Sequence, residues 1–192
     1  MKERILVTGG TGYIGSHTVV ELQNSGYEVI IIDNLSNSSA DVVDNIEKVS
    51  GIRPVFEKLD CLDFAGLDAM FAKYPGIKAI IHFAASKAVG ESVQKPLLYY
   101  RNNLVSLINL LELMPKHNVG GIVFSSSCTV YGQPDELPVT EQAPIKKAES
   151  PYGNTKQINE EIVRDTVASG TPINAILLRY FNPIGAHPTA LL

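Results

Sequence analysis

The sequence predicts an α/β protein of the doubly wound Rossmann type, in which helices cover both faces of a parallel sheet. Short apolar runs alternate with longer segments of helical periodicity along the 192 residues. The run at residues 29–32 is entirely β-branched, which is typical of a strand buried on both faces. A glycine-rich segment, residues 9–15, directly follows the first apolar run. With 45% hydrophobic and 19% charged residues, the composition indicates one folded domain and excludes a disordered chain.

The individual elements follow from these patterns in chain order. The first strand is predicted at residues 4–7, because the apolar run of residues 5–7 comes shortly before the glycines. A helix at residues 12–25 ends at Gly26, because glycine accepts the left-handed conformation common just after a helix. The second strand, residues 29–32, ends at Asp33. Further strands are expected at residues 54–59, 79–84, 122–125 and 174–178. Further helices are expected at residues 39–49, 62–71, 96–116 and 152–168. Such helical crossovers are what parallel strands require.

One segment lacks this alternation. Residues 133–151 contain four prolines and many charges, so they predict a long loop between the fifth strand and the next helix. Loops of this length in compact domains are usually functional or disordered.

The composition and net charge indicate which partners the protein could bind and in which compartment it could be found. Sixteen basic and twenty acidic residues give a net charge of −4, which offers no case for nucleic acid or an anionic membrane as partner. Two cysteines, Cys61 and Cys128, make no disulfide framework and show no metal-ligand spacing. Residues 1–4 run directly into a strand, which fits no signal peptide, and no apolar stretch approaches the roughly 20 residues of a membrane helix. We therefore expect a cytoplasmic protein without a metal.

The glycine-rich segment has the spacing of a dinucleotide-binding loop. Gly9, Gly12 and Gly15 lie three residues apart, between the first strand and the first helix. Glycines allow the tight turn and the close approach of backbone amides to a pyrophosphate, which the helix N-terminus also favours. The alternative is an ordinary glycine turn. The complete strand-helix-strand unit that contains the motif favours nucleotide binding.

Asp33 ends the second strand, 18 residues beyond Gly15. A carboxylate there would accept hydrogen bonds from the adenosine ribose and repel a 2′-phosphate, so we expect NAD rather than NADP. The alternative is a strand-ending aspartate that caps the next turn. Further hydrogen bonds to the adenosine are expected from Asn34, Asn37, Ser38 and Asp60.

A second group of polar residues predicts chemistry on an alcohol. Residues 125–127 are three serines after the fifth strand, and Tyr152 and Lys156 are four residues apart on one helix face. A nearby ammonium lowers the pKa of a phenol and makes it a better base. With a serine to bind the alcohol oxygen, these groups would remove the carbinol proton while hydride leaves to NAD. The alternative is a solvated lysine beside a half-buried tyrosine. His82 is expected to be packed in the core.

These motifs together resemble the extended short-chain dehydrogenases/reductases that act on nucleotide sugars. The resemblance is carried by the glycine loop, Asp33, Ser127, Tyr152 and Lys156, and it extends over essentially the whole chain. Its most specific pieces are residues 8–17, 87–92, 125–132 and 179–188.

The resemblance implies a role for each matching position. Ser127 and Tyr152 would flank the sugar 4-hydroxyl, with Tyr152 as the base, and Lys156 would hold the nicotinamide ribose. The cofactor-binding residues would be Gly9, Gly12, Tyr13, Ile14, Gly15, Asp33, Asn34, Asn37, Ser38, Asp60, Cys61, Phe83, Ala84, Ala85, Lys87, Asn102, Tyr152, Lys156 and Tyr180. The substrate-binding residues would be Lys87, Ser127, Tyr152, Phe181 and Asn182.

The reaction that the resemblance implies is NAD-dependent epimerisation at carbon 4 of UDP-glucose and UDP-galactose through a 4-keto intermediate. Dehydratases and decarboxylases of the family have acidic residues just after the position of Ser127, whereas this chain has Cys128 and Thr129. That difference favours simple epimerisation. The alternatives are a uronic-acid 4-epimerase and a stand-alone NAD-binding module without catalysis.

The family's chains are longer, with a second domain that grips the nucleotide sugar. We expect residues 1–185 to form the NAD-binding domain and residues 186–192 to be the truncated start of the substrate-binding region. On this expectation the chain is a fragment that binds NAD but epimerises UDP-hexose poorly or not at all. A homodimer built from the helices at residues 96–116 and 152–168 is the expected assembly.

Overall fold

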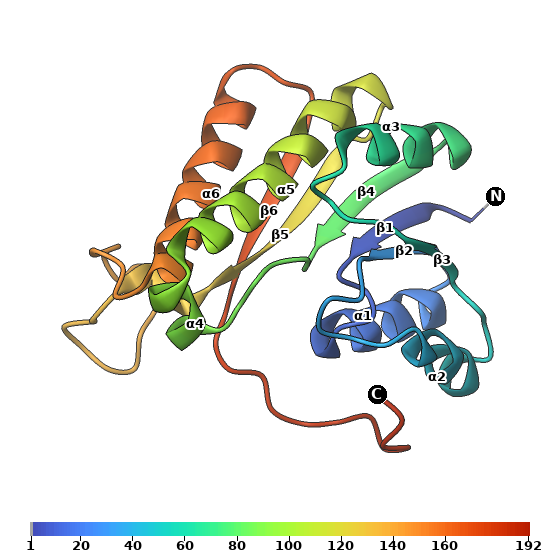
Figure 1. Ribbon diagram of the computed structural model, residues 1–192, viewed down its shortest axis with the longest axis horizontal. Coiled ribbons are helices and arrows are strands. Elements are labelled where there is room, and N and C mark those ends of the chain that lie inside the picture. Colours follow the sequence, from blue (N-terminus) through green and yellow to red (C-terminus); the bar gives the residue numbers. More distant parts are fainter. Residues whose placement is uncertain (1) are drawn as a thin grey trace.

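A computed structural model of the chain describes residues 2–192; Met1, the first residue of the expected NAD-binding domain, lies outside them (Figure 1). Six parallel strands form one sheet in the order β3-β2-β1-β4-β5-β6. This topology confirms the predicted doubly wound α/β class. The strands are β1 (Arg4–Thr8), β2 (Glu28–Asp33), β3 (Val55–Lys58), β4 (Ile77–His82), β5 (Gly121–Ser127) and β6 (Asn174–Tyr180). The helices are α1 (Tyr13–Asn24), α2 (Asp41–Ser50), α3 (Phe64–Lys73), α4 (Val89–Gln94), α5 (Pro96–Lys116) and α6 (Pro151–Ala168), with a 3-10 turn, η1 (Cys128–Tyr131).

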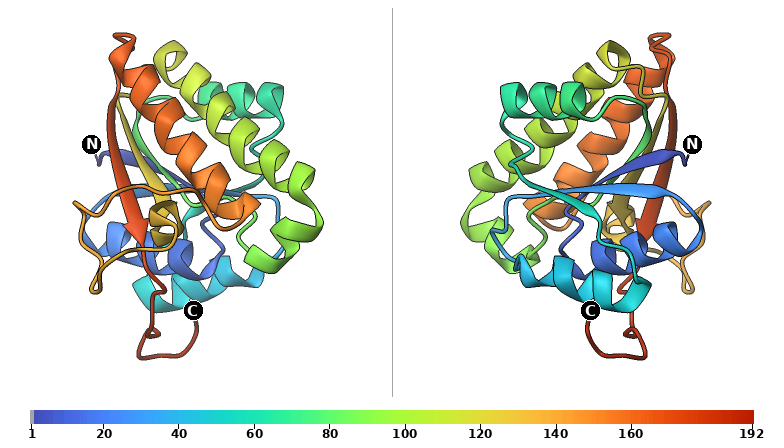
Figure 2. Two further views of the ribbon diagram at one scale, coloured as in Figure 1. Left: turned by 90° about the vertical axis from the view of Figure 1, so that its left-hand side faces the viewer. Right: turned by 90° about the vertical axis from the view of Figure 1, so that its right-hand side faces the viewer.

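The helices divide into two layers because side chains alternate across each central strand. On one face, Val7 of β1 and Ile31 of β2 pack with the apolar side chains of α1 and α2. On the other face, Leu6 and Ile30 of the same strands pack with those of α3, α5 and α6. Figure 2 shows the two layers on opposite sides of the sheet. The β-branched run of β2 is thus buried on both faces, as predicted.

Four differences from the predicted elements lie near the carboxyl edge of the sheet. Helix α4 and the turn η1 were not predicted. Strand β4 ends at His82, two residues before the predicted end, so Phe83 and Ala84 belong to the following loop. Strand β5 extends through Ser127, because the three serines continue the ladder with residues 178–180 of β6. The serines therefore end the strand rather than follow it.

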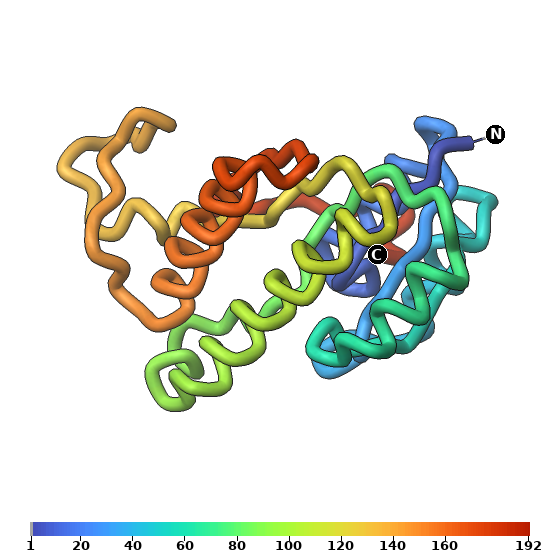
Figure 3. Tube along the Cα trace, turned by 90° about the horizontal axis from the view of Figure 1, so that it is seen from above, coloured from blue at the N-terminus to red at the C-terminus, as the bar shows by residue number. Residues whose placement is uncertain are grey.

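Two segments without helix or strand lie at the ends of the molecule. The long loop before α6 projects at one end of the long axis, opposite β3 and α2 (Figure 3). After β6, residues 181–192 run beneath α1 (Figure 1). There the Tyr13 hydroxyl donates to the Gly185 carbonyl, and the His187 backbone N–H donates to His17 Nε2 at 3.1 Å. The segment is therefore fastened to the first turns of α1.

Among residues 2–192, no helix is both long enough and apolar enough to cross a membrane.

Candidate active site

The glycine loop joins β1 to α1 at the point where the strand order reverses, between β1 and β4. Such a reversal opens a crevice at the carboxyl edge of the sheet. Gly9 has φ +68°, and a Cβ on Gly15 would lie 2.3 Å from the Gly9 carbonyl oxygen, so neither position accepts a larger residue without strain. Gly12 is the N-cap of α1 and has no side chain to accept from the first turn. The N–H groups of that turn thus point to the crevice and fit a pyrophosphate.

Asp33 ends β2 beside this loop and is 9% exposed. One carboxylate oxygen accepts from the Leu35 backbone N–H at 2.9 Å and from Ser38 Oγ at 3.3 Å. The other accepts from the Thr11 backbone N–H at 3.3 Å. The capping alternative is therefore realised. A carboxylate has about four acceptor sites, so it also retains capacity for a ribose hydroxyl.

Other predicted cofactor residues meet at the same edge. Asn34 Nδ2 donates to Asp60 Oδ2 at 2.9 Å, which joins the ends of β2 and β3. The ring centres of Phe83, just after β4, and Tyr180, at the end of β6, are 6.3 Å apart, although these two strands are not neighbours in the sheet. Asn102 Nδ2 donates to Ser86 Oγ at 3.2 Å and so contacts the loop after β4. Cys61 is buried after β3, while Asn37, Lys87, Phe181 and Asn182 are exposed.

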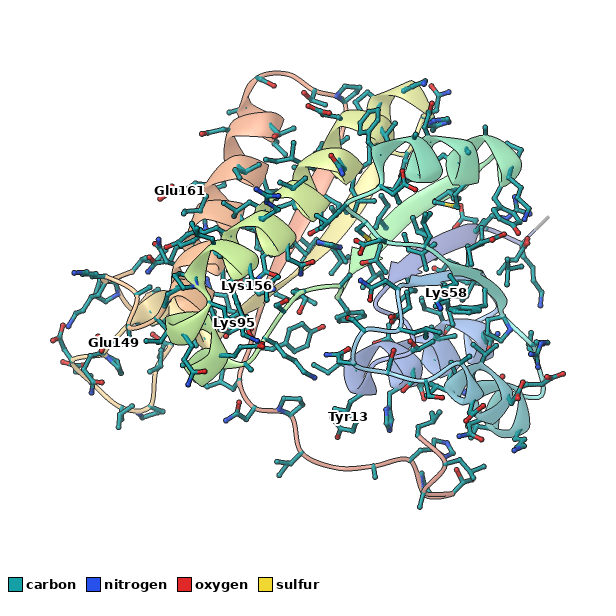
Figure 4. All side chains as sticks on the ribbon, viewed as in Figure 1. Tyr13, Lys58, Lys95, Glu149, Lys156 and Glu161 are labelled. Carbon is teal, nitrogen blue, oxygen red and sulfur yellow. The ribbon has the colours of Figure 1, made fainter. Side chains whose placement is uncertain are left out.

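The predicted catalytic residues converge from β5 and α6. Ser127 is the last residue of β5 and Tyr152 lies in the first turn of α6, which Ser150 caps by accepting from the Gly153 N–H at 3.1 Å. One turn further on, Lys156 Nζ donates to the Ser125 carbonyl at 2.6 Å. The ammonium lies 5.8 Å from the centre of the Tyr152 ring and 4.8 Å from that of Phe124. Lys156, which is labelled in Figure 4, is 4% exposed.

The pKa of Tyr152 contradicts one expectation. Burial raises the pKa of this phenol above its ordinary value, while a hydrogen-bonding interaction with Ser127 acts in the opposite direction. The predicted fall does not occur in the protein itself, because desolvation of the phenolate dominates. Burial also lowers the pKa of Lys156 to about 8. In the folded chain, burial thus shifts both Tyr152 and Lys156 toward their neutral forms.

Two further titratable side chains near the ends of the strands, His82 and Cys61, are buried. His82 is fully buried, and burial lowers its pKa to about 3, with Lys156 acting in the same direction. Its Nδ1 lies 2.7 Å from Thr8 Oγ1, which confirms a packed core histidine. Burial raises the pKa of Cys61 to about 12, so this thiol is inert. Within residues 2–192, no three His, Cys, Asp or Glu side chains gather in a metal-binding arrangement.

Two buried polar groups around α6 escape the sequence analysis. Asn103 of α5 accepts from the Ser86 N–H at 2.8 Å and donates to Thr155 Oγ1 at 3.1 Å, which joins the loop after β4 to α6. Glu160 of α6 pairs with Arg179 of β6. Asn103 is hidden in the apolar pattern of a long helix. Glu160 could have been found from the sequence, because it follows Lys156 by four residues, as Lys156 follows Tyr152, and this spacing places all three on one helix face.

Comparisons with known proteins agree with this geometry. The profile of the NAD dependent epimerase/dehydratase family matches residues 5–191. The chain is similar to the UDP-glucose 4-epimerase of Dictyostelium discoideum, with 50% identity over 99% of this chain and 55% of that protein. It is also similar to the UDP-glucose 4-epimerase of Bacillus subtilis, with 53% identity over 96% of this chain and 54% of that protein.

The solved structures show the same likeness. The UDP-glucose 4-epimerase of Bifidobacterium longum, in complex with NAD+ and UDP, superposes with a TM-score of 0.95 at 48% identity. The match covers 98% of this chain and 56% of that one. The chain therefore spans about half the length of the relatives that it matches.

Replacing Lys156 by methionine is expected to stabilise the fold at pH 7. The folded-state pKa of Lys156, about 8, lies below its ordinary 10.5, so the folded chain holds a protonated lysine at a cost that is fully present below pH 8. That cost is relieved as pH rises to 10.5. The variant loses the hydrogen bond to the Ser125 carbonyl but no longer has this cost. Its free energy of unfolding at pH 7 is therefore expected to rise by on the order of 1–3 kcal/mol.

Urea unfolding at pH 7 and pH 9.5 measures this gain. Lys48→Met, at an exposed position of α2, is the control and should change little at either pH. A destabilised Lys156→Met chain at pH 7, or a gain that does not shrink at pH 9.5, would contradict the prediction.

Proposed function

We propose that this chain, which belongs to the NAD dependent epimerase/dehydratase family, uses NAD to interconvert UDP-glucose and UDP-galactose by inversion at sugar carbon 4. The observation that carries the proposal is the convergence of Ser127, Tyr152 and Lys156 at the edge of the sheet where the glycine loop also lies. The family match and the relatives named above support it.

The proposed binding of NAD follows the carboxyl edge of the sheet. The first turn of α1 receives the pyrophosphate and Asp33 receives the adenosine ribose. Asn34, Asn37, Ser38, Asp60 and Cys61 surround the adenosine. Ala84, Ala85, Lys87, Asn102 and Tyr180 follow the path to the nicotinamide, where Lys156 holds the ribose.

In the proposed mechanism, Ser127 binds the sugar 4-hydroxyl and Tyr152 takes its proton. NAD bound in this way would supply the acceptor that takes the carbon-4 hydride and returns it to the other face of the sugar. The positive charge of Lys156 stabilises the Tyr152 phenolate, and Tyr152 returns the proton when the hydride comes back. Lys87, Phe181 and Asn182 hold the substrate on the open side of the crevice.

The burial of Lys156 favours this enzyme over a cofactor-binding module without chemistry. A module that only binds NAD gains nothing from an ammonium that is 4% exposed and whose pKa burial lowers to about 8. A base that must be tuned at each turnover does gain, since a buried charge acts more strongly on its neighbours than a solvated one.

The remaining proposals concern organisation and location. Residues 1–185 are assigned to the NAD-binding domain and residues 186–192 to the start of the substrate-binding region. A cytoplasmic location is proposed because both cysteines, Cys61 and Cys128, are free thiols.

A homodimer is the proposed assembly. Leu97, Val105 and Ile108 lie at helical spacing along one side of α5 and are exposed, as is Val93 of α4. An apolar stripe of this kind on a long helix is typical of helix pairing between subunits.

The first test of the cofactor site is the affinity for NAD. Asp33→Ala removes the proposed ribose acceptor and is expected to weaken NAD binding at least about tenfold, which corresponds to one or two hydrogen bonds to a charged group. Isothermal titration measures the change, with Asp165→Ala, an exposed aspartate of α6, as the matched control. Equal affinities of the three proteins, or no binding of NAD by the natural chain, would overturn the proposed site.

The test of the chemistry is the reduction of bound NAD by UDP-galactose, followed by absorbance at 340 nm. Tyr152→Phe removes the proposed base and is expected to slow this step by about 10²–10⁴-fold. Tyr27→Phe, remote from the crevice, is the control. Formation of UDP-glucose in the same mixture would show that the hydride returns to the sugar with inversion at carbon 4. A natural chain that binds NAD but never reduces it with UDP-galactose would contradict the proposed reaction.

The dimer is tested by a charge on the proposed interface. Leu97 is 82% exposed, and Leu97→Glu is expected to convert the assembly from twice 20.8 kDa to a monomer, because an unpaired carboxylate is costly to bury. Light scattering after size-exclusion chromatography gives the mass. Leu137→Glu, which is equally exposed in the long loop, should leave the dimer intact. A monomeric natural chain, or a dimer in both variants, rejects this interface.

A further inference from the structure

Three side chains of α6 face the three consecutive serines at the end of β5. Tyr152, Lys156 and Glu160 are spaced by four residues and share one face of the helix. Tyr152 interacts with the side chain of Ser127, and Lys156 Nζ donates to the carbonyl of Ser125. The third side chain, Glu160, accepts from Ser126 Oγ at 2.6 Å. Tyr152 and Lys156 belong to the proposed catalytic site, whereas Glu160 has no role in the proposed mechanism.

Glu160 is the most heavily bonded of the three. It is 1% exposed, and Arg179 of β6 donates to both of its carboxylate oxygens, at 2.9 and 2.7 Å. Arg164, one turn further along α6, donates at 2.7 Å. The Arg179 guanidinium also lies over the ring of Tyr131, 4.8 Å from its centre. Glu160 thus connects α6 directly with β5 and β6, and Arg179 extends the connection to the turn η1.

The bonds around Glu160 are directional, and this distinguishes them from apolar packing. Burial acts to raise the pKa of Glu160, but the hydrogen bonds from Arg179 and Ser126 outweigh it and the carboxyl stays ionised. Buried ion pairs often add little to stability compared with apolar residues of similar size. What they can provide is a defined register between elements. A slip of α6 by one residue would move each of its side chains about 1.5 Å along the helix axis.

We propose that Glu160 is a positioning residue of the active site: by joining Ser126 to Arg179, it fixes α6 along β5 and so holds Tyr152 opposite Ser127 and Lys156 opposite the Ser125 carbonyl. That this site is catalytic rests on the proposed function. The positioning itself is a property of the chain alone, and it is testable without cofactor or sugar.

The readout is the titration of Lys156, followed by the ¹³Cε chemical shift of labelled lysine and assigned by the loss of the signal in Lys156→Met. The pKa of Lys156 is lowered because the packing of α6 against β5 buries its ammonium away from water. Its neighbours are Ser125, Phe124, Tyr152 and His82, and His82 stays neutral above pH 5. If α6 loosens, water reaches the ammonium and its pKa rises toward 10.5.

Two variants separate position from charge. Ser126→Ala removes one bond of Glu160 without changing any charge, and it is expected to raise the pKa of Lys156 by about half a unit. Glu160→Gln should raise it by about one unit. A purely electrostatic role predicts the opposite sign for Glu160→Gln, since removing a negative charge near an ammonium lowers its pKa. Glu161→Gln, the neighbouring carboxylate on the outward side of α6, is the control and should leave the titration unchanged (Figure 4).

The outcomes are distinct. A raised pKa in both variants with an unchanged control establishes positioning. A lower unfolding free energy with an unchanged Lys156 titration overturns it, because Glu160 then stabilises the fold alone. A fall of the pKa in Glu160→Gln also overturns it. If Glu160→Gln does not fold, Ser126→Ala decides between the first two results. Failure of NAD binding would reject the proposed function and leave this result standing.

Discussion

The parallel pairing of all six strands is the constraint on which the site depends. Because every strand runs in the same direction, every strand ends at the same edge of the sheet. The glycine loop, Asp33, Asp60, Phe83, Ser127 and Tyr180 are far apart in the chain, and each lies at or just beyond the end of a different strand. Apolar residues on both faces of the sheet maintain the strand pairing. The two apolar cores therefore determine where the polar groups at the edge lie, although those groups are not part of the cores.

Helix α6 brings the remaining chemistry to this edge, and it does so at a cost. Its face toward the sheet carries a half-buried phenol, a buried ammonium and a buried carboxylate in addition to the apolar Val163. The carboxylate is compensated by two arginines and a serine. The ammonium has one carbonyl and two aromatic rings. The least compensated of these groups is Lys156, and it is the one whose charge the proposed base requires.

The sequence could predict what depends on local pattern. The β-branched run of β2, the glycines before α1 and the spacing of Tyr152 and Lys156 each carry their signal within a few residues. Elements that depend on distant pairing are less predictable. The three serines at the end of β5 have low strand propensity and become strand only through their ladder with β6. Helix α4 has six residues, one of them glycine, and too short a pattern to register.

The pKa of Tyr152 illustrates a deeper limit. A tyrosine four residues from a lysine suggests a phenol made acidic by its neighbour, but the spacing alone does not show what it costs to bury the phenolate. In the folded chain α6 lies against β5 and both groups lose water, so each shifts toward its neutral form. The pair alone is therefore in its resting state. In the proposed function, a further positive charge in the crevice, as an oxidised nicotinamide would carry, would stabilise the phenolate and make Tyr152 a base when the hydride acceptor is in place. The burial that raises the cost of the Lys156 charge would then couple proton removal to the presence of the acceptor.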